Sequence, residues 1–295
     1  KLHFLPTNKV RLSVDKNTVL KHKVVNPKYN DSIVPYIDID IKGGAIYKNR
    51  LIMLDIIANN NWKRPVCFTG GSFGDDDYLW MKDFLQLDGM VYKLVPVKTP
   101  VDEENAPYDL GQIDSDKMYN SIVTQKYSED NNRIGWDWGN GESTKIYHDP
   151  ETRKNSISTR NNLSRLMDQL IKEGKVDKAK KIIELALNKL PLDYYGYYSA
   201  VDPFANGYYE VGETQKAREL LSKLAVKYKQ QLTYFATLTP ANQYYLATEI
   251  MTAIERYRGL LEIMKKNNDT DFYTKNKAEF NNYNKRFARF GRDME

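Results

Sequence analysis

The sequence predicts a mixed α/β domain over residues 1–155, a small layered sheet with helices, followed by an all-α array of helical hairpins over residues 156–295. Two observations support this division. Apolar residues recur with a period of two in short segments of the first part, and with helical spacing in long segments of the second. At 295 residues, the chain is also long enough for two domains that each bury a core.

The first domain is predicted to alternate strands and helices. Residues 36–41 alternate apolar and polar side chains, which predicts a half-buried strand, and residues 47–59 carry a helical apolar stripe. Residues 65–69 form a short apolar run, which predicts a buried strand with an inert thiol at Cys67. This order of elements favours a layered α/β unit.

Three further elements complete the first domain. Residues 75–87 are predicted to form a helix whose first turn is acidic, where the helix dipole favours negative charge. Residues 91–98 alternate like a strand, and residues 114–125 are predicted to form a helix. A loop rich in glycine and tryptophan, residues 135–141, then precedes the domain boundary.

The second domain contains two copies of a helical hairpin with an offset of 38 residues. In the first copy, Thr159 is predicted to cap the first helix, Gly174 to end it, and Pro191 to end the second helix. A long helix is predicted to follow from Thr239, with proline at its first position, and a last helix near residues 280–290. The residues matched between the copies are Gly174 and Gly212, Lys178 and Lys216, Ala179 and Ala217, Ile182 and Leu220, and Ile183 and Leu221.

This repeat resembles the tetratricopeptide pattern. With Arg160 as the first position, bulky residues fall at the packing positions, Gly174 falls in the turn and Ala179 falls at the close helix crossing. The second copy is weaker, because Leu224 and Lys229 stand where alanine and proline are expected. The resemblance implies a short helical array whose concave surface binds a peptide or a partner protein.

The composition excludes several classes of protein. Hydrophobic residues make up 41% of the chain, so it is not a disordered polymer. The net charge is +5, but lysines alternate with acids on the predicted helices, which disfavours nucleic-acid binding. One cysteine and three separated histidines exclude an internal disulfide framework and disfavour a metal site built from these residues. No apolar run approaches the roughly 18 residues of a membrane span.

Tyrosine pairs are the most unusual feature of the second domain, at residues 194–195, 197–198, 208–209 and 244–245. With the tryptophans of the preceding loop, they can form a stacking surface for a sugar or a partner peptide. The alternative is that tyrosine fills a helical core while its hydroxyl reaches solvent. The residues predicted to bind a ligand or partner are Trp136, Trp138, Tyr194, Tyr198, Tyr208 and Tyr209.

Two groups of acids are candidates for chemistry. Asp75, Asp76 and Asp77 can hold a divalent cation, although contiguous acids do not converge as spaced ligands do, and acidic helix capping is the alternative. Asp38 and Asp40 lie two residues apart on one strand face, which suits either general acid–base catalysis or a solvated face. These alternatives lead to the expectation of no catalytic residue and no resident metal in this chain.

Three segments resemble one known family: residues 33–71, 77–100 and 137–171. The most specific motifs are Asn-Trp-Lys-Arg-Pro at residues 61–65, LQLDGMVYKLVP at 85–96 and Tyr-His-Asp-Pro at 147–150. The family is the C-terminal extramembrane region of polytopic membrane proteins of Bacteroidetes that resemble protein O-mannosyltransferases, long catalogued as a domain of unknown function. The resemblance covers residues 1–265.

The resemblance implies a bundle of transmembrane helices that precedes this region, in an inner-membrane protein whose soluble part faces the periplasm. Transferases of this type use a polyprenyl-phosphate sugar and carry an acidic catalytic residue in an early extracytoplasmic loop, outside this chain. The chain is therefore expected to be an accessory domain without a cofactor. Its expected partners are its own transmembrane region and an acceptor protein or glycan.

Two other functions stay open at this point. The chain can be a stand-alone scaffold whose helical groove binds peptides, as helical-repeat arrays do. It can also be a soluble carbohydrate-active enzyme that uses Asp38, Asp40 or the acids at residues 75–77.

Overall fold

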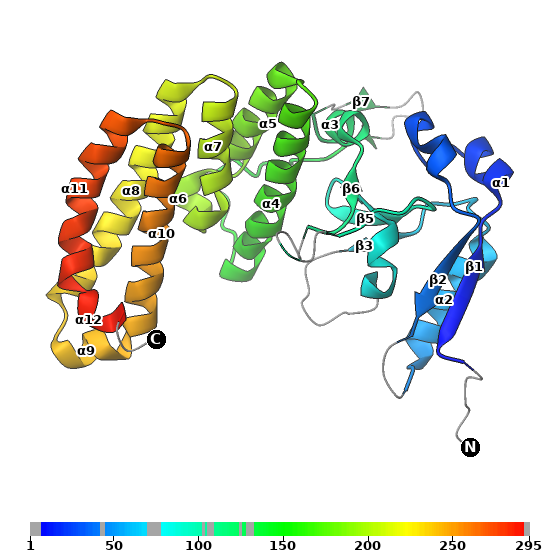
Figure 1. The fold of residues 1–295 in the computed structure, drawn as a ribbon, viewed down its shortest axis with the longest axis horizontal. Coiled ribbons are helices and arrows are strands. Elements are labelled where there is room, and N and C mark those ends of the chain that lie inside the picture. The colour runs from blue at the N-terminus through cyan, green and yellow to red at the C-terminus, as the bar shows by residue number, and fades with distance from the viewer. Residues whose placement is uncertain are drawn as a thin grey trace. The chain divides into compact units, whose positions relative to one another are not determined.

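Short strands and helices make up residues 1–137 in a computed structural model of the chain, whereas helices dominate residues 138–295 (Figure 1). This confirms the predicted fold class. The two parts are separate compact units that divide between Asp137 and Trp138. The structure describes residues 7–41, 45–69, 78–101, 104, 109–123, 126–127 and 133–291.

A two-stranded antiparallel sheet opens the first unit. β1 (Lys9–Ser13) pairs with β2 (Tyr36–Asp40). Ile37 and Ile39 are fully buried, whereas Asp38 between them is exposed, because successive side chains point to opposite faces of a strand. The predicted half-buried strand is confirmed. The helical segments of this unit are α1 (Lys16–Lys21), a 3₁₀ turn at Pro27–Ser32, α2 (Lys48–Asn60), a 3₁₀ segment at Tyr78–Phe84 and α3 (Ser115–Val123).

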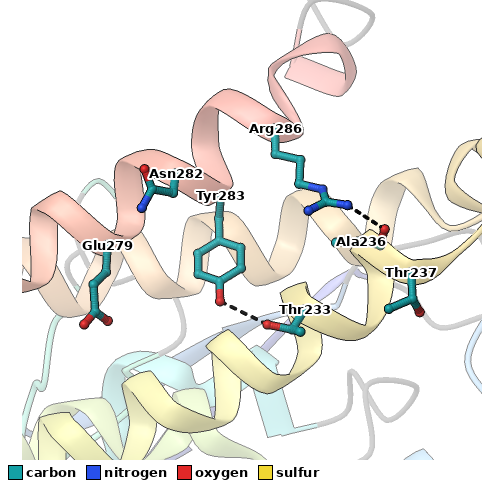
Figure 2. Close-up of a pocket in the computed structure, with 7 residues that line it drawn as sticks. All are labelled: Thr233, Ala236, Thr237, Glu279, Asn282, Tyr283 and Arg286. Carbon is teal, nitrogen blue, oxygen red and sulfur yellow. Dashed lines mark hydrogen bonds between the residues drawn. The ribbon is translucent and has the colours of Figure 1, made fainter.

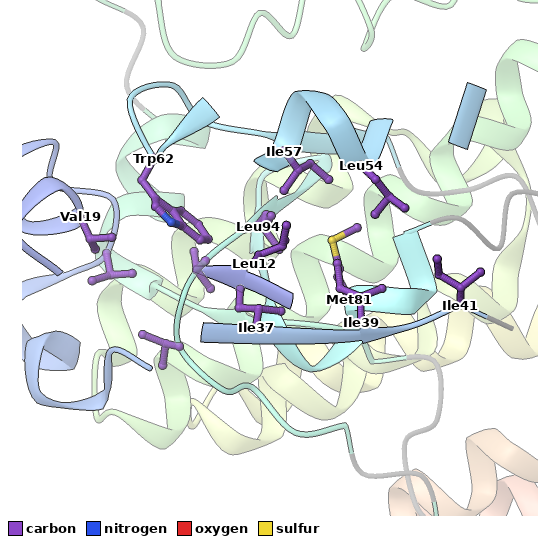
Figure 3. Packing of buried hydrophobic residues seen from close by; sticks show 13 residues of the cluster. Leu12, Val19, Ile37, Ile39, Ile41, Leu54, Ile57, Trp62, Met81 and Leu94 are labelled. Atoms are coloured by element: carbon purple, nitrogen blue, oxygen red, sulfur yellow. The ribbon is translucent and has the colours of Figure 1, made fainter. Parts of the chain in front are cut away.

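The core of the first unit collects apolar side chains from distant parts of the sequence, as Figure 3 shows. β1 and β2 contribute one side of it, and α2 contributes Leu54 and Ile57. Asn61 ends α2 in a left-handed conformation, as the asparagine run predicts, and Trp62 turns into the core. The labelled members are Leu12, Val19, Ile37, Ile39, Ile41, Leu54, Ile57, Trp62, Met81 and Leu94.

A four-stranded sheet follows, in the order β3 (Cys67–Thr69), β5 (Val91–Leu94), β4 (Leu85–Asp88) and β6 (Gln112–Ile113). β4 and β6 are parallel, and the other pairs are antiparallel. β7 (Lys126–Tyr127) and β8 (Arg133–Ile134) form a separate short ladder. The predicted strand at residues 65–69 exists, but the prediction that it is buried is wrong. β3 lies at the sheet edge, so Cys67 and Thr69 are exposed.

The predicted helix at residues 75–87 is confirmed only as a 3₁₀ segment over Tyr78–Phe84 and is wrong over residues 85–87. Tyr78–Phe84 is a 3₁₀ segment, and Leu85–Asp88 is strand β4, while residues 75–77 lie outside the described residues. β4 lies between β5 and β6, so Leu85 and Leu87 are both fully buried. The pairing with two neighbouring strands therefore overrides the local helical signal.

Three helical hairpins build the second unit: α4–α5, α7–α8 and α10–α11 (Figure 1). The first helices of consecutive hairpins contact each other, and α8 packs along α10. This arrangement agrees with a short tetratricopeptide-like array. The helices are α4 (Pro150–Lys172), α5 (Val176–Lys189), α6 (Leu192–Tyr195), α7 (Asp202–Glu210), α8 (Thr214–Thr237), α9 (Pro240–Tyr245), α10 (Ala247–Lys266), α11 (Thr270–Arg286) and α12 (Ala288–Gly291), with a 3₁₀ turn at Tyr198–Ala200.

α4 begins earlier than the sequence predicts. Asp149 caps it by accepting hydrogen bonds from the backbone N–H groups of Glu151 and Thr152, with proline at the first position. Thr159 lies inside the helix, where its hydroxyl donates to the carbonyl of Asn155 at 2.8 Å. The prediction of a cap at Thr159 is therefore wrong, and the predicted boundary at residue 155 falls within α4.

The helix predicted from Thr239 is confirmed at its start and interrupted soon after. The Thr239 side chain accepts from the backbone N–H of Asn242, and Pro240 follows it. Leu246 leaves the helical conformation, so α9 and α10 are separate helices. Within the described ranges, every helix is too short or too polar to cross a lipid bilayer.

Candidate functional site

The three hairpins share one turn geometry. Gly174, Gly212 and Asn268 are all left-handed, with φ of 72°, 79° and 58°. In each turn, the next residue donates its N–H to a carbonyl five residues back, as Lys175 does to Leu170 at 2.8 Å. The third copy was missed in the sequence because asparagine replaces glycine there. The shared turn geometry shows that the array has at least three equivalent hairpins.

Charged side chains link consecutive hairpins at equivalent positions. Lys180 and Arg218 each lie six residues after the left-handed turn residue of their own hairpin. Lys180 contacts Glu213 at 2.8 Å, and Arg218 contacts Asp269 through two hydrogen bonds of 2.6 and 2.8 Å. Glu213 and Asp269 each follow the turn residue of the next hairpin. An ion pair thus recurs at the equivalent position of both junctions between consecutive hairpins.

Tyr209, one of the predicted binding residues, belongs to the second of these links. Its hydroxyl donates to Asp269 at 2.6 Å. Burial and this hydrogen bond raise the pKa of the Tyr209 hydroxyl, while the Arg218 hydrogen bonds lower the pKa of Asp269. Asp269 therefore stays ionised, and its two oxygens accept from both Arg218 and Tyr209.

Tyr194 and Tyr195 on α6 hold the segment that precedes α4. The Tyr194 hydroxyl accepts from the backbone N–H of His148 at 2.9 Å and donates to the carbonyl of Ile146 at 2.5 Å. The Tyr195 hydroxyl donates to the carbonyl of Gly141 at 2.8 Å. The predicted binding residue Tyr194 thus anchors the segment before α4 through hydrogen bonds to its backbone.

The other predicted aromatic residues are buried or half-buried. Tyr208 is buried, and Tyr198 packs edge-on against Tyr228 with ring centroids 6.3 Å apart. Trp138, in the second unit, is 9% exposed. Trp136 is half-buried and belongs to the first unit. Ligand binding by these side chains stays a prediction.

A buried polar cluster lies where α7, α8 and α10 meet. One carboxyl oxygen of Asp202 and the hydroxyl of Tyr228 are both buried without a hydrogen-bond partner among the described residues. Burial raises the pKa of Asp202 to about 7, against the attraction of Arg256. Burial and the Asp202 charge also raise the pKa of Tyr228. This cluster could not be predicted from the sequence, because an aspartate at the start of a helix is ordinarily solvated.

The acids predicted as catalytic candidates are exposed and ion-paired where they are described. Asp38 accepts two hydrogen bonds from Arg11, at 2.7 and 2.8 Å, and Asp40 lies 3.6 Å from Lys9. The Arg11 hydrogen bond lowers the pKa of Asp38, which disfavours a role as proton donor near neutral pH. Residues 75–77 lie outside the described residues. No group of three potential metal ligands occurs among the residues that the structure describes.

The second sheet of the first unit carries a buried lysine. Lys93 on β5 is 6% exposed, and its amine donates to the carbonyl of Val24 at 2.5 Å. Burial lowers the pKa of this amine. Cys67 pairs with it across the sheet, and partial burial raises the pKa of the thiol, so the exposed Cys67 stays protonated and weakly reactive.

A groove runs along α8 beside α11. Two hollows of about 440 Å³ each share Thr233 as a lining residue. The hollow in Figure 2 lies between the two helices, and the second continues along α8. Tyr283 bonds to Thr233 at 3.0 Å, and Arg286 donates to the carbonyl of Ala236 at 2.7 Å.

Comparison with known proteins finds a similarity within the first unit. Residues 1–117 match the family model described as TMEM260-associated domain 2. No curated protein and no solved structure matches the chain significantly. The family match therefore covers most of the first unit and stops before the helical array.

Proposed function

We propose that this chain is a non-catalytic accessory part of a membrane glycosyltransferase-like protein and that its helical array engages the acceptor protein or glycan. The match of residues 1–117 to a TMEM260-associated domain carries the proposal, because it is compatible with an accessory domain of a membrane protein. The resemblance to the extramembrane region of protein O-mannosyltransferase-like proteins supports the glycosyltransferase assignment.

The first unit offers a surface suited to packing on the membrane portion of such a protein. α2 buries Leu54 and Ile57 but exposes Leu51, Ile52 and Ile56, at 40%, 50% and 59%. A helix that is apolar on more than one face usually has more than one partner. The proposed partner for the exposed face is the protein's own transmembrane region.

The second unit offers a scaffold for a partner. Helical hairpins that stack through repeated contacts present extended surfaces, and the equivalent links at Glu213 and Asp269 fix the hairpins to one another. We place this unit in the periplasm of an inner-membrane protein. A polyprenyl-phosphate sugar would be handled by the transmembrane portion, and this chain would bring the acceptor.

Cell fractionation tests the proposal. Antibody raised against this chain should detect a band well above 34.4 kDa that stays with membranes after an alkaline wash. Deletion of this region from the full-length protein should abolish transfer to the acceptor while the membrane portion remains expressed. A soluble band at 34.4 kDa would contradict the proposal and favour a stand-alone peptide-binding scaffold.

A further inference from the structure

Exposed apolar side chains of the second unit concentrate on two neighbouring helices. Seven large apolar or aromatic side chains are exposed among the described residues of this unit, and four of them lie on α8 and α9. They are Val226, Tyr234, Tyr244 and Tyr245, exposed at 46%, 58%, 73% and 86%. The tyrosines on α6 and α7 make internal contacts instead.

Two of these exposed residues, Val226 and Tyr234, line the groove between α8 and α11. Val226 and Tyr234 line one hollow, and Thr237 lies at the far end of the other. From Val226 to Thr237, α8 rises about 16 Å, which matches about five residues of an extended peptide. The groove is therefore long enough for a peptide segment.

The charged side chains that line the groove are Lys229, Glu279 and Arg286, which together carry one net positive charge. Lys229 is ion-paired with Glu279 inside the groove. Arg286 and Arg289 donate instead to neutral acceptors, the carbonyl of Ala236 and the side-chain oxygen of Gln243. Neither arginine has a carboxylate partner among the residues that the structure describes.

We propose that the groove between α8 and α11 binds an acidic peptide segment of the acceptor protein. Arg286, exposed at one end, binds a carboxylate of the peptide, because guanidinium groups pair with carboxylates through two parallel hydrogen bonds. Val226 and Tyr234 bind an apolar side chain farther along. The assignment of the peptide to the acceptor protein rests on the proposed function. The binding of an acidic peptide in the groove does not depend on it.

Selection from a displayed library of random 12-residue peptides against the immobilised full chain tests the proposal. The enriched peptides should contain more Asp and Glu than the starting library, together with an aliphatic or aromatic residue. The affinity of one enriched peptide is then measured for the wild-type chain and its variants by fluorescence polarisation.

Two groove variants have matched controls on α5. Val226→Asp and Arg286→Glu should each weaken binding about tenfold or more. Val226→Asp places a charge beneath the apolar side chain of the bound peptide, and Arg286→Glu repels the carboxylate of the peptide. Val176→Asp and Lys181→Glu change an exposed valine and an exposed lysine on α5 and should leave binding unchanged. Arg286→Gln removes only the charge, and far-UV circular dichroism of each variant checks folding.

Enrichment of neutral or basic peptides, or of none, would overturn the proposal. So would acidic peptides whose binding is equally sensitive to the α5 controls. These outcomes are separable from failure of the proposed function, since cell fractionation reports on the membrane protein and not on the groove. A soluble chain that still selects acidic peptides through Arg286 would be a stand-alone scaffold.

Discussion

The two junctions of the helical array are built from different chemistry at equivalent positions. At 38 residues before Asp202, Tyr209 and Tyr228, the first hairpin has Ser164, Ile171 and Leu190. The Ser164 hydroxyl is satisfied by the carbonyl of Asn161, whereas Asp202 keeps an unpartnered oxygen. At these three positions, the first hairpin therefore has neutral side chains where the second has an aspartate and two tyrosines.

The acidic partner of the ion pair is also more buried at the second junction than at the first. The Lys180–Glu213 side chains are 32% and 31% exposed, whereas that of Asp269 is 3% exposed. Exposed ion pairs contribute little to stability, but a buried carboxylate with several donors is costly to disturb. Repetition of a backbone turn therefore preserves the position of an ion pair without preserving its contribution to stability.

The largest expected effect is at Asp202. Its pKa is raised from 3.8 to about 7 in the folded chain, so the folded state holds a proton that the unfolded state has released. Stability should therefore fall as pH rises from about 4 to about 7 and then level off. Asp202→Asn should remove this fall and stabilise the chain at about pH 8 by at most about 4 kcal/mol.

Urea unfolding of wild type and Asp202→Asn at about pH 5 and pH 8 measures this effect. Asp177→Asn, an exposed acid in the first turn of α5, is the control and should behave like wild type. An equal pH dependence of the free energy of unfolding in both proteins would show that Asp202 is ionised in the fold.

The next effect compares the two turn acids directly. Asp269→Ala should lower the melting temperature more than Glu213→Ala, because it leaves Arg218 and Tyr209 without their shared acceptor. Thermal unfolding followed by circular dichroism measures both variants. Equal losses would mean that the second junction gains nothing from its buried carboxylate.

Alanine substitutions at two helical glycines should have smaller effects on stability, of opposite sign. A Cβ at Gly259 on α10 meets nothing within 4 Å, so Gly259→Ala should stabilise the chain by about 1 kcal/mol. A Cβ at Gly207 on α7 would lie 2.2 Å from the Met167 sulfur and 3.3 Å from Ile183. Gly207→Ala should therefore destabilise the chain, and a gain in melting temperature there would show that Met167 relaxes freely.

The smallest expected effect is local. Tyr194→Phe removes the hydroxyl that bonds His148 and Ile146, so amide exchange should speed up in the segment before α4 while global unfolding changes little. Tyr244→Phe, on an exposed ring, is the control. Hydrogen exchange read by mass spectrometry compares the two variants, and unchanged exchange in residues 141–148 would contradict the anchoring role.

Local patterns were sufficient for the parts of this fold in which one segment decides its own conformation. The alternation around Ile37 and Ile39, the cap at Thr239 and the alanines Ala179 and Ala217 are such signals. Each depends on side-chain period or on a hydrogen bond within a few residues. The fold class and the repeated hairpins could therefore be predicted from the sequence.

Contacts between distant segments decided the rest. Residues 85–88 became a strand because β5 and β6 pair with them, and Cys67 became exposed because β3 lies at the sheet edge. The acceptors of Arg218 and the environment of Asp202 depend on which helices pack together. Burial and partner choice are properties of the assembled fold, since a single segment carries no record of what covers it.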